Sequence, residues 1–147
     1  MKVRQDVKPA SEDGIVIDHI GIAVKSVAES LRFYEKALGL RASAVESIPR
    51  EKTRVAMLHV GESRIELLEP TDPDSPIGRF LAKHGGGIHH ISLRVPALEQ
   101  AVRQLKESGA EVISAEPGVG AGGHRYVFIH PRSTGGVLLE LVEGPAR

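Results

Sequence analysis

Two histidines and two glutamates stand at matching places in apolar, strand-like segments of this sequence: His19, Glu66, His90 and Glu140. Their segments are IDHIGIAV (17–24), IELLEP (65–70), IHHISLRV (88–95) and LELVEG (139–144). A carboxylate among apolar residues needs a partner, because burying an unpaired charge is costly. Two imidazoles and two carboxylates form a nitrogen and oxygen donor set for a divalent transition-metal ion. The residue types therefore indicate a metal site that could act as a Lewis acid in catalysis.

The four segments belong to an internal repeat. Residues 17–24 align without gaps on residues 88–95, 71 positions later, and residues 65–70 align on residues 139–144, 74 positions later. Each copy predicts the order strand, helix, strand, strand, strand. If the two copies pack around a pseudo-two-fold axis, the four polar side chains converge on one concave surface.

The repeat also sets the expected domain boundaries. We expect a flexible arm over 1–13 and a single domain over 14–144, made of module one (14–70), a linker with a short helix (71–87) and module two (88–144). Helices are predicted from the capping residue Ser26 to Gly39, over 77–87 and over 96–109. Further strands are predicted around 42–48, 53–60, 111–114 and 125–130. The glycine-rich segment 116–123 is predicted to form a mobile loop over the site.

Composition excludes several classes of protein. Lysine plus arginine equals aspartate plus glutamate at 19 each, so no basic excess favours nucleic acid or an anionic membrane surface as a partner. The absence of cysteine excludes disulfides and thiolate metal sites. The polar N-terminal segment lacks the apolar core of a signal peptide, and no apolar run reaches the roughly 20 residues that span a bilayer. A cytoplasmic location is expected.

Strand alternation separates the two adjacent histidines of the second copy. Neighbouring side chains of a strand point to opposite faces, which predicts that His89 and His90 do not serve the same site. The repeat pairs His90 with His19 and His89 with Asp18, so His90 is the expected ligand and His89 a supporting or packing residue. No role in the site is predicted for the other histidines, His59, His84, His124 and His130, and the strand-end carboxylates Glu69 and Glu143 are predicted to be solvated.

Over about residues 15–144 the sequence resembles the vicinal oxygen chelate superfamily, and within it the methylmalonyl-CoA epimerase family. The resemblance is carried by IDHIGIAV, FYEKALGL, RIELLEPTDPDSPIGRFLAKHGGGIHHISLRV and EPGVGAGGHRYVFIHPRSTGGVLLELVE. It implies an α+β fold in which two βαβββ modules form an open, curved mixed sheet around a metal, usually in a homodimer. The family's metal ligands fall on His19, Glu66, His90 and Glu140. Cobalt is the ion expected first, and manganese, nickel, zinc and magnesium are also compatible.

The resemblance implies that the substrate is a CoA thioester, methylmalonyl-CoA, whose (2R) and (2S) epimers are interconverted. The C2 hydrogen lies between a thioester carbonyl and a carboxylate, so a metal that chelates both oxygens can stabilise the enolate. Inversion needs a base on each face of C2, and Glu66 and Glu140 are the expected pair. Some family members place a proposed catalytic glutamate where this sequence has Val55, which leaves Glu46 or Glu51 as alternatives. Charge alone suggests Arg125 and Arg132 as contacts for the CoA tail.

Three other functions remain open on the sequence. A glyoxalase I-like lyase shares the two-histidine, two-glutamate set, although the DSPIGRFLAKHGGGIHH and HPRSTGGVLLEL segments favour the epimerase. An extradiol dioxygenase uses two histidines and one glutamate on ferrous iron, and the fourth ligand, Glu66, argues against it. A small-molecule binding protein of the same fold generally lacks the ligands that are all present here.

Overall fold

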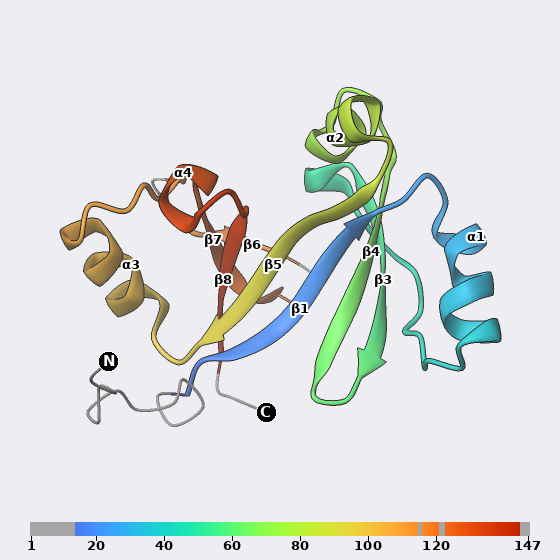
Figure 1. Cartoon of the computed structure of the whole chain (residues 1–147), viewed down its shortest axis with the longest axis horizontal. Coiled ribbons are helices and arrows are strands. Elements are labelled where there is room, and N and C mark those ends of the chain that lie inside the picture. The colour runs from blue at the N-terminus through green and yellow to red at the C-terminus, as the bar shows by residue number, and fades with distance from the viewer. Residues whose placement is uncertain (1–13, 115, 121–122, 145–147) are drawn as a thin grey trace, which may run out of the picture.

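The computed structural model describes residues 14–144 except 115, 121 and 122, so the arm expected over 1–13 lies outside the described residues. Eight strands form one curved sheet in the order β2-β3-β4-β1-β5-β8-β7-β6. The strands are β1 (Val16–Ala23), β2 (Glu46–Ile48), β3 (Thr53–Val60), β4 (Ser63–Pro70), β5 (Gly87–Val95), β6 (Gly118–Val119), β7 (Arg125–Ile129) and β8 (Leu139–Glu143). The predicted α+β fold with an open, curved mixed sheet is confirmed (Figure 1).

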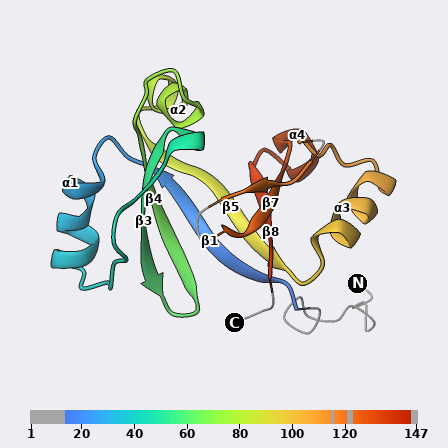
Figure 2. The same ribbon diagram turned by 180° about the vertical axis from the view of Figure 1, so that it is seen from behind.

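Helices cover the two ends of the sheet and leave its middle strands open, as Figures 1 and 2 show from opposite sides. The helical segments are α1 (Val27–Leu31), continued by the π-helix η1 (Arg32–Ala37), the 3₁₀ turn η2 (Pro49–Glu51), α2 (Pro76–His84), α3 (Leu98–Glu107) and α4 (Pro131–Thr134). The Ser26 hydroxyl accepts from the Glu29 N–H at the start of α1, and Gly39 follows η1 with a φ of 83°, as the sequence predicts. Over the described residues, no helix is long and apolar enough to cross a membrane.

The sheet repeats its pairing pattern in two halves. In the first half β1 pairs with β4 in parallel, and in the second half β5 pairs with β8 in parallel, while β1 and β5 join the halves in antiparallel fashion. Separate apolar clusters fill the two halves: Val27 and Leu58 lie in the cluster with α1, and Leu98 and Ile129 in the one with α3. Burial of each such side chain stabilises the fold by about 1.5–3 kcal/mol. The two packed halves thus hold the central strands between them.

Two β-bulges interrupt the junction between β1 and β5. The partners Ile17↔Leu93 and His19↔Ser92 leave Asp18 as an extra residue of β1. The partners Gly21↔His90 and Ile22↔Ile88 leave His89 as an extra residue of β5. A bulge breaks the alternation of faces at the extra residue, so the prediction that His89 and His90 point to opposite faces is wrong.

The second half departs from the predicted strands in one place. The strand expected at 111–114 is a single bridge between Val112 and Ile129, and the two-residue strand β6 lies instead in the glycine-rich segment predicted to be a loop. Pro117 has no N–H to donate, so it interrupts the strand between these two short pairings. In the first half, the strand expected over 42–48 shortens to β2, with an isolated bridge at Ala42.

Candidate metal centre

The structure brings the four predicted ligands together at the centre of the sheet. His19, Glu66, His90 and Glu140 are all buried, with 4–8% of each residue exposed. The strand register explains why the four side chains meet. Gly21 of β1 pairs with Glu66 of β4 and with His90 of β5. Ser92 of β5 pairs with His19 on one side and with Glu140 of β8 on the other. The repeat therefore delivers two donors from each half to one point.

The donor atoms are spaced as ligands of one ion. His19 Nε2 lies 3.0 Å from His90 Nε2, 3.4 Å from Glu140 Oε1 and 3.5 Å from Glu66 Oε1. His90 Nε2 lies 3.6 Å from the same Glu66 oxygen. Ligand atoms about 2.1 Å from an ion are separated by roughly 3.0–3.4 Å at octahedral or tetrahedral angles. His19, His90 and Glu140 each offer an atom within 4.8 Å of the others, so these three residues could hold a metal. Glu66 is not part of that group, and it approaches the cluster through the two histidine nitrogens.

Asp18 orients the first histidine. Its Oδ2 lies 2.6 Å from His19 Nδ1, while Arg64 and Arg94 donate to its carboxylate at 2.8 and 2.7 Å. Burial alone would raise the pKa of Asp18, but the hydrogen bond with His19 and the two guanidinium groups hold that pKa far below its usual range. An ionised Asp18 accepts the Nδ1 proton of His19, which leaves the Nε2 lone pair facing the other donors.

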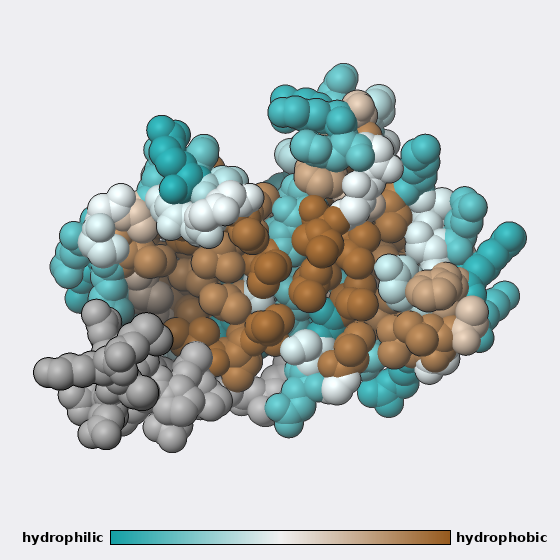
Figure 3. Space-filling model, in the orientation of Figure 1, coloured by the Kyte–Doolittle hydropathy of each residue, from teal (hydrophilic) through white to brown (hydrophobic). Residues whose placement is uncertain are grey.

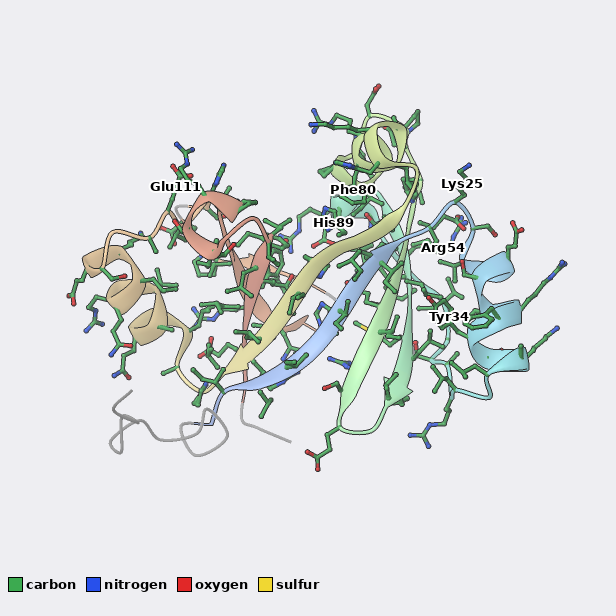
Figure 4. The ribbon with its side chains drawn as sticks, viewed as in Figure 1. Lys25, Tyr34, Arg54, Phe80, His89 and Glu111 are labelled. Carbon is green, nitrogen blue, oxygen red and sulfur yellow. The ribbon has the colours of Figure 1, made fainter. Side chains whose placement is uncertain are left out.

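His89 supports the second histidine in the same position. His89 Nδ1 lies 2.9 Å from His90 Nδ1. The Phe80 ring packs edge-on against the His89 ring at a centroid distance of 5.0 Å (Figure 4). Burial, with the nearby His19 and His89, lowers the pKa of His90, so its ring is neutral as a metal ligand requires. The supporting role predicted for His89 agrees with these contacts.

Gly21 makes room for the second histidine. A Cβ atom at this position would lie 2.2 Å from His90 Cε1 and 2.5 Å from His90 Nδ1, which no side chain can occupy. In the repeat, Gly21 aligns with Ser92, so the two halves differ where the His90 ring crosses β1. The glycine is therefore required by the ring and not by an unusual φ.

The two buried glutamates bind protons more tightly than usual in the ion-free protein. Burial, reinforced by Glu140 and Glu51 and opposed by His19, raises the pKa of Glu66 to about 7. Burial also raises the pKa of Glu140, again opposed by His19. Burial lowers the pKa of His19, but Asp18 and the two glutamates outweigh it and raise the pKa overall. A divalent cation would take the place of these protons and neutralise the carboxylates.

The donor cluster opens into a cavity of about 600 Å³. Apolar side chains from both halves line part of it, among them Leu68, Ile77 and Phe128. The guanidinium groups of Arg50 and Arg79 also reach it, and so does the His124 ring. His124 thus lines the cavity, contrary to the prediction that gave it no place there. Such a mixed cavity can take a small molecule that carries apolar and anionic groups.

The arginines suggested for the CoA tail lie elsewhere. Arg125 donates to Glu143 at 2.8 Å through its Nε and pairs with Glu99, and Arg132 pairs with Glu111 at 3.4 Å. Neither is among the described residues that line the cavity. No contact with the cavity supports that suggestion among the described residues, and it stays a prediction.

Glu69 also differs from its prediction as a solvated residue. Its Oε1 accepts from the Val27 N–H at 2.8 Å, and Arg54 pairs with its other oxygen. The carboxylate thus satisfies a free N–H at the start of α1 and fixes this helix on the sheet.

Of the alternative bases, only Glu51 is placed at the cavity. Glu51 lines it and accepts from the Tyr126 hydroxyl at 2.9 Å, while Glu46 is exposed and is not among the described lining residues. Val55 is 3% exposed and packs in an apolar cluster with Leu68 and Ile77. The sequence did not predict that Tyr126 contacts Glu51 or that Arg64 and Arg94 pair with Asp18. The available signal for Asp18 and Arg94 was that each is a charged residue within an apolar strand segment.

Sequence comparisons relate the chain to one superfamily and, within the matched relatives, to proteins named as methylmalonyl-CoA epimerases. Residues 18–128 match the model of the Glyoxalase/Bleomycin resistance protein/Dioxygenase superfamily. The chain is 37% identical to the mitochondrial methylmalonyl-CoA epimerase of Homo sapiens, over 85% of this chain and 72% of that protein. It is 38% identical to the ethylmalonyl-CoA/methylmalonyl-CoA epimerase of Cereibacter sphaeroides, over 85% and 95%. It is also 41% identical to the uncharacterized protein YqjC of Bacillus subtilis, over 86% and 91%.

Solved structures give the same relationship. The methylmalonyl-CoA epimerase of Mycobacterium tuberculosis superposes with a TM-score of 0.82 at 36% identity, covering 89% of this chain and 88% of that one. A variant of the Streptomyces coelicolor methylmalonyl-CoA epimerase, in complex with 2-nitronate-propionyl-CoA, superposes with a TM-score of 0.83 at 36% identity, covering 87% and 96%. The similarity therefore extends over nearly the whole of both chains.

Proposed function

Because the chain belongs to the Glyoxalase/Bleomycin resistance protein/Dioxygenase superfamily, we propose that it is a metal-dependent epimerase that interconverts (2R)- and (2S)-methylmalonyl-CoA. The observation that carries the proposal is the meeting of two buried glutamates with two histidines at the floor of the cavity. The epimerase names of the relatives from Homo sapiens and Cereibacter sphaeroides support the substrate class.

His19, Glu66, His90 and Glu140 are the proposed ligands, and the spacing of their donor atoms supports them. A divalent ion bound there would act as a Lewis acid that stabilises the charge developing on the thioester oxygen when C2 loses its proton. Cobalt is the ion proposed first, and the donor set also accepts manganese, nickel, zinc or magnesium. Asp18 keeps His19 in the tautomer that can bind the ion.

Glu66 and Glu140 are the proposed acid and base. They come from strands of opposite halves of the sheet, β4 and β8, so they approach the cavity from two sides. One carboxylate takes the C2 proton from one face, and the other, already protonated, returns a proton to the opposite face. In the ion-free protein, burial raises the pKa of Glu66 to about 7 and also raises the pKa of Glu140, so both carboxylates bind a proton more readily than exposed ones. A carboxylate has two oxygens, so binding an ion through one leaves the other to accept a proton.

A glyoxalase I-like lyase remains the second candidate, because it uses the same donor set and also moves a proton next to a carbonyl. The deciding experiment compares turnover of purified, metal-loaded protein on both epimers of methylmalonyl-CoA with turnover on the glutathione hemithioacetal of methylglyoxal. We expect epimerisation to dominate. Strong turnover of the hemithioacetal, without epimerisation, would replace the first proposal by the second.

We further propose that the protein is a homodimer that pairs through the outer face of β1 and β5. Figure 3 shows apolar side chains gathered over the middle of this face, which Figure 1 shows without a covering helix. Ile17 and Ile88 are 47% and 63% exposed. Ile22 packs in the cluster that contains Val27 of α1, on the face opposite the cavity. Ile88 is the strand partner of Ile22, so the Ile88 side chain lies on that same face. An apolar patch of this kind is typical of a protein interface.

A further inference from the structure

Two apolar side chains stand at equivalent places in the two halves of the sheet and have no part in the proposed function so far. Residues 54–59 (RVAMLH) align on residues 125–130 (RYVFIH) at an offset of 71 positions, which is also the offset between the two histidine segments. Met57 of β3 therefore corresponds to Phe128 of β7. Both side chains line the cavity that contains the donor cluster.

Strand alternation places these two side chains on the cavity face of the sheet. Leu58, the neighbour of Met57, is buried in the apolar cluster with α1. Ile129, the neighbour of Phe128, is buried in the cluster with α3. Adjacent side chains of a strand point to opposite faces, so Met57 and Phe128 point away from the helices and into the cavity.

The register places each of them beside one of the two proposed bases. Met57 is the strand partner of Glu66, and Phe128 is the strand partner of Glu140. Directly paired residues of antiparallel strands have Cβ atoms about 4.5–5.5 Å apart and lie on the same face. The Phe128 ring also packs edge-on against the His90 ring at a centroid distance of 5.7 Å. Each glutamate thus has one apolar neighbour at its side.

Inversion at C2 makes these neighbours important for the substituent on that carbon. In the proposed reaction, Glu66 and Glu140 face opposite sides of C2. The alkyl group leans away from the C2 hydrogen, so it leans toward Glu140 while the hydrogen faces Glu66. After the new C–H bond has formed on the Glu140 side, the alkyl group leans toward Glu66. The substituent of one epimer therefore contacts Phe128, and that of the other epimer contacts Met57.

We propose that Met57 and Phe128 are specificity-determining residues that bind the C2 substituent and limit its size, one side chain for each epimer. This inference rests on the proposed epimerase function. In an apolar site, one methylene group changes the specificity constant by about 10–200-fold, so the space beside each side chain decides whether an ethyl group is accepted in place of a methyl group. Neither side chain carries a titratable group, so they act by packing alone.

The test compares metal-loaded variants on ethylmalonyl-CoA and methylmalonyl-CoA. Met57→Ala shortens the side chain beside Glu66, and we expect it to raise the ratio of kcat/KM for the ethyl substrate to kcat/KM for the methyl substrate by roughly tenfold. Met57→Phe, which copies the second half, should lower this ratio. Val60→Ala is the matched control, because Val60 lies on the same strand, is 41% exposed and is not among the described residues that line the cavity. Its ratio should equal that of wild type.

The assignment of one side chain to each epimer gives a second readout. For any variant, the ratio of kcat/KM between the two epimers equals their equilibrium constant, so a preference between epimers appears in KM and kcat separately. Met57→Ala should lower KM roughly tenfold for one epimer of ethylmalonyl-CoA only, and Phe128→Leu should lower KM for the other. Metal content is measured in each variant, because Phe128 packs on a proposed ligand; the Met57 variants carry the test if Phe128→Leu loses the metal.

Binding of diethylmalonyl-CoA provides a readout that needs no turnover. This thioester has an ethyl group on each face of C2 and no C2 hydrogen, so it binds without reacting. Calorimetric titration should show that the double variant Met57→Ala, Phe128→Leu binds it at least roughly tenfold more tightly than wild type.

An unchanged ethyl-to-methyl ratio in both Met57 variants would overturn the proposal. Equal changes of KM for both epimers in Met57→Ala would overturn it as well, because they would indicate a general widening of the cavity. A wild-type protein that epimerises neither thioester would overturn the proposed function. In that case, unaltered binding of diethylmalonyl-CoA by the double variant would also overturn the substituent site, whereas tighter binding would support it.

Discussion

Asp18 and His89 occupy equivalent positions in the two halves of the sheet, each as the extra residue of a β-bulge and each hydrogen-bonded to the ring of the histidine that follows it. The bulges turn two adjacent side chains toward one cavity, which a regular strand cannot do. The pair is chemically unequal, because an ionised carboxylate supports His19 and an imidazole supports His90. The two halves of the site therefore share a backbone design and differ in electrostatics.

We expect Asp18→Asn to weaken metal binding. The variant keeps a hydrogen-bond acceptor for His19 Nδ1 but removes the charge that makes His19 a better donor to a metal and that pairs with Arg64 and Arg94. Loss of such a supporting contact typically lowers metal affinity by about 10–100-fold. Calorimetric titration with cobalt measures it, with Glu69→Gln as the control, because Glu69 pairs with Arg54 and α1. Equal affinities of Asp18→Asn and wild type would contradict the role assigned to Asp18.

Gly21→Ala is expected to disrupt the centre by collision. The added methyl group would meet the His90 ring at 2.2 Å, so the ring must leave its place. We expect loss of metal binding and a fall in stability of about 1–3 kcal/mol, measured by denaturant unfolding and metal analysis. Gly39→Ala is the matched control, because it strains a φ of 83° with open space around it, far from the site. It should lose stability only. Metal binding that survives in Gly21→Ala would refute the packing described for His90.

The stability of the ion-free protein should report the raised pKa of Glu66. The pKa of Glu66 is about 7 in the folded protein and 4.5 in the unfolded chain, so the proton binds more tightly to the folded protein. The resulting stabilisation is complete below pH about 4.5 and is lost as the pH rises through about 7. Glu66→Gln stays neutral at every pH. The difference in unfolding free energy, wild type minus variant, should therefore fall by about 3 kcal/mol between pH about 4 and 8. Urea unfolding with a chelator present measures it, and parallel pH profiles of the two proteins would show that Glu66 has an ordinary pKa.

The dimer proposal is tested by a charge on the outer face. Ile88→Lys places an ammonium group in the apolar patch of β1 and β5 at a site that is 63% exposed, so it should leave the fold intact. Sedimentation velocity should show a dimer for wild type and a monomer for this variant. Val45→Lys, at an exposed position near β2, should remain a dimer. A wild-type monomer at micromolar concentration would exclude the interface.

The repeat in the sequence predicted much of the site because symmetry links distant segments. Aligning residues 17–24 on 88–95, at an offset of 71, selected His19 and His90, and aligning residues 65–70 on 139–144, at an offset of 74, selected Glu66 and Glu140. The fold brings these side chains into contact. The order of strands and helices in each copy followed from elements whose periodicity and caps were plain, such as the helix that begins after Ser26. The open, curved sheet was implied by the family resemblance.

Features that depend on register or on distant contacts were not predictable in this way. A one-residue bulge leaves no mark in the alternation of IHHISLRV, so His89 was assigned to the wrong face. The capping of α1 by Glu69 and the pairing of Arg125 with Glu143 depend on strands that meet only in the fold. Tyr126 donates to Glu51 from the other half of the molecule. The space for its ring depends on Gly118 and Gly120, and the sequence alone does not show that these glycines face the ring.

The most direct test of the central claim is the incorporation of solvent deuterium at C2 of methylmalonyl-CoA. Purified protein, loaded with cobalt, is incubated in D₂O with each pure epimer, with and without a chelator, and the product is analysed by NMR and mass spectrometry. We predict that each epimer gives the mixture of both, that the newly formed epimer carries deuterium at C2, and that the chelator and the double variant Glu66→Gln, Glu140→Gln both abolish the reaction. Absence of C2 exchange in the metal-loaded wild-type protein, or unchanged exchange in the double variant, would contradict the account.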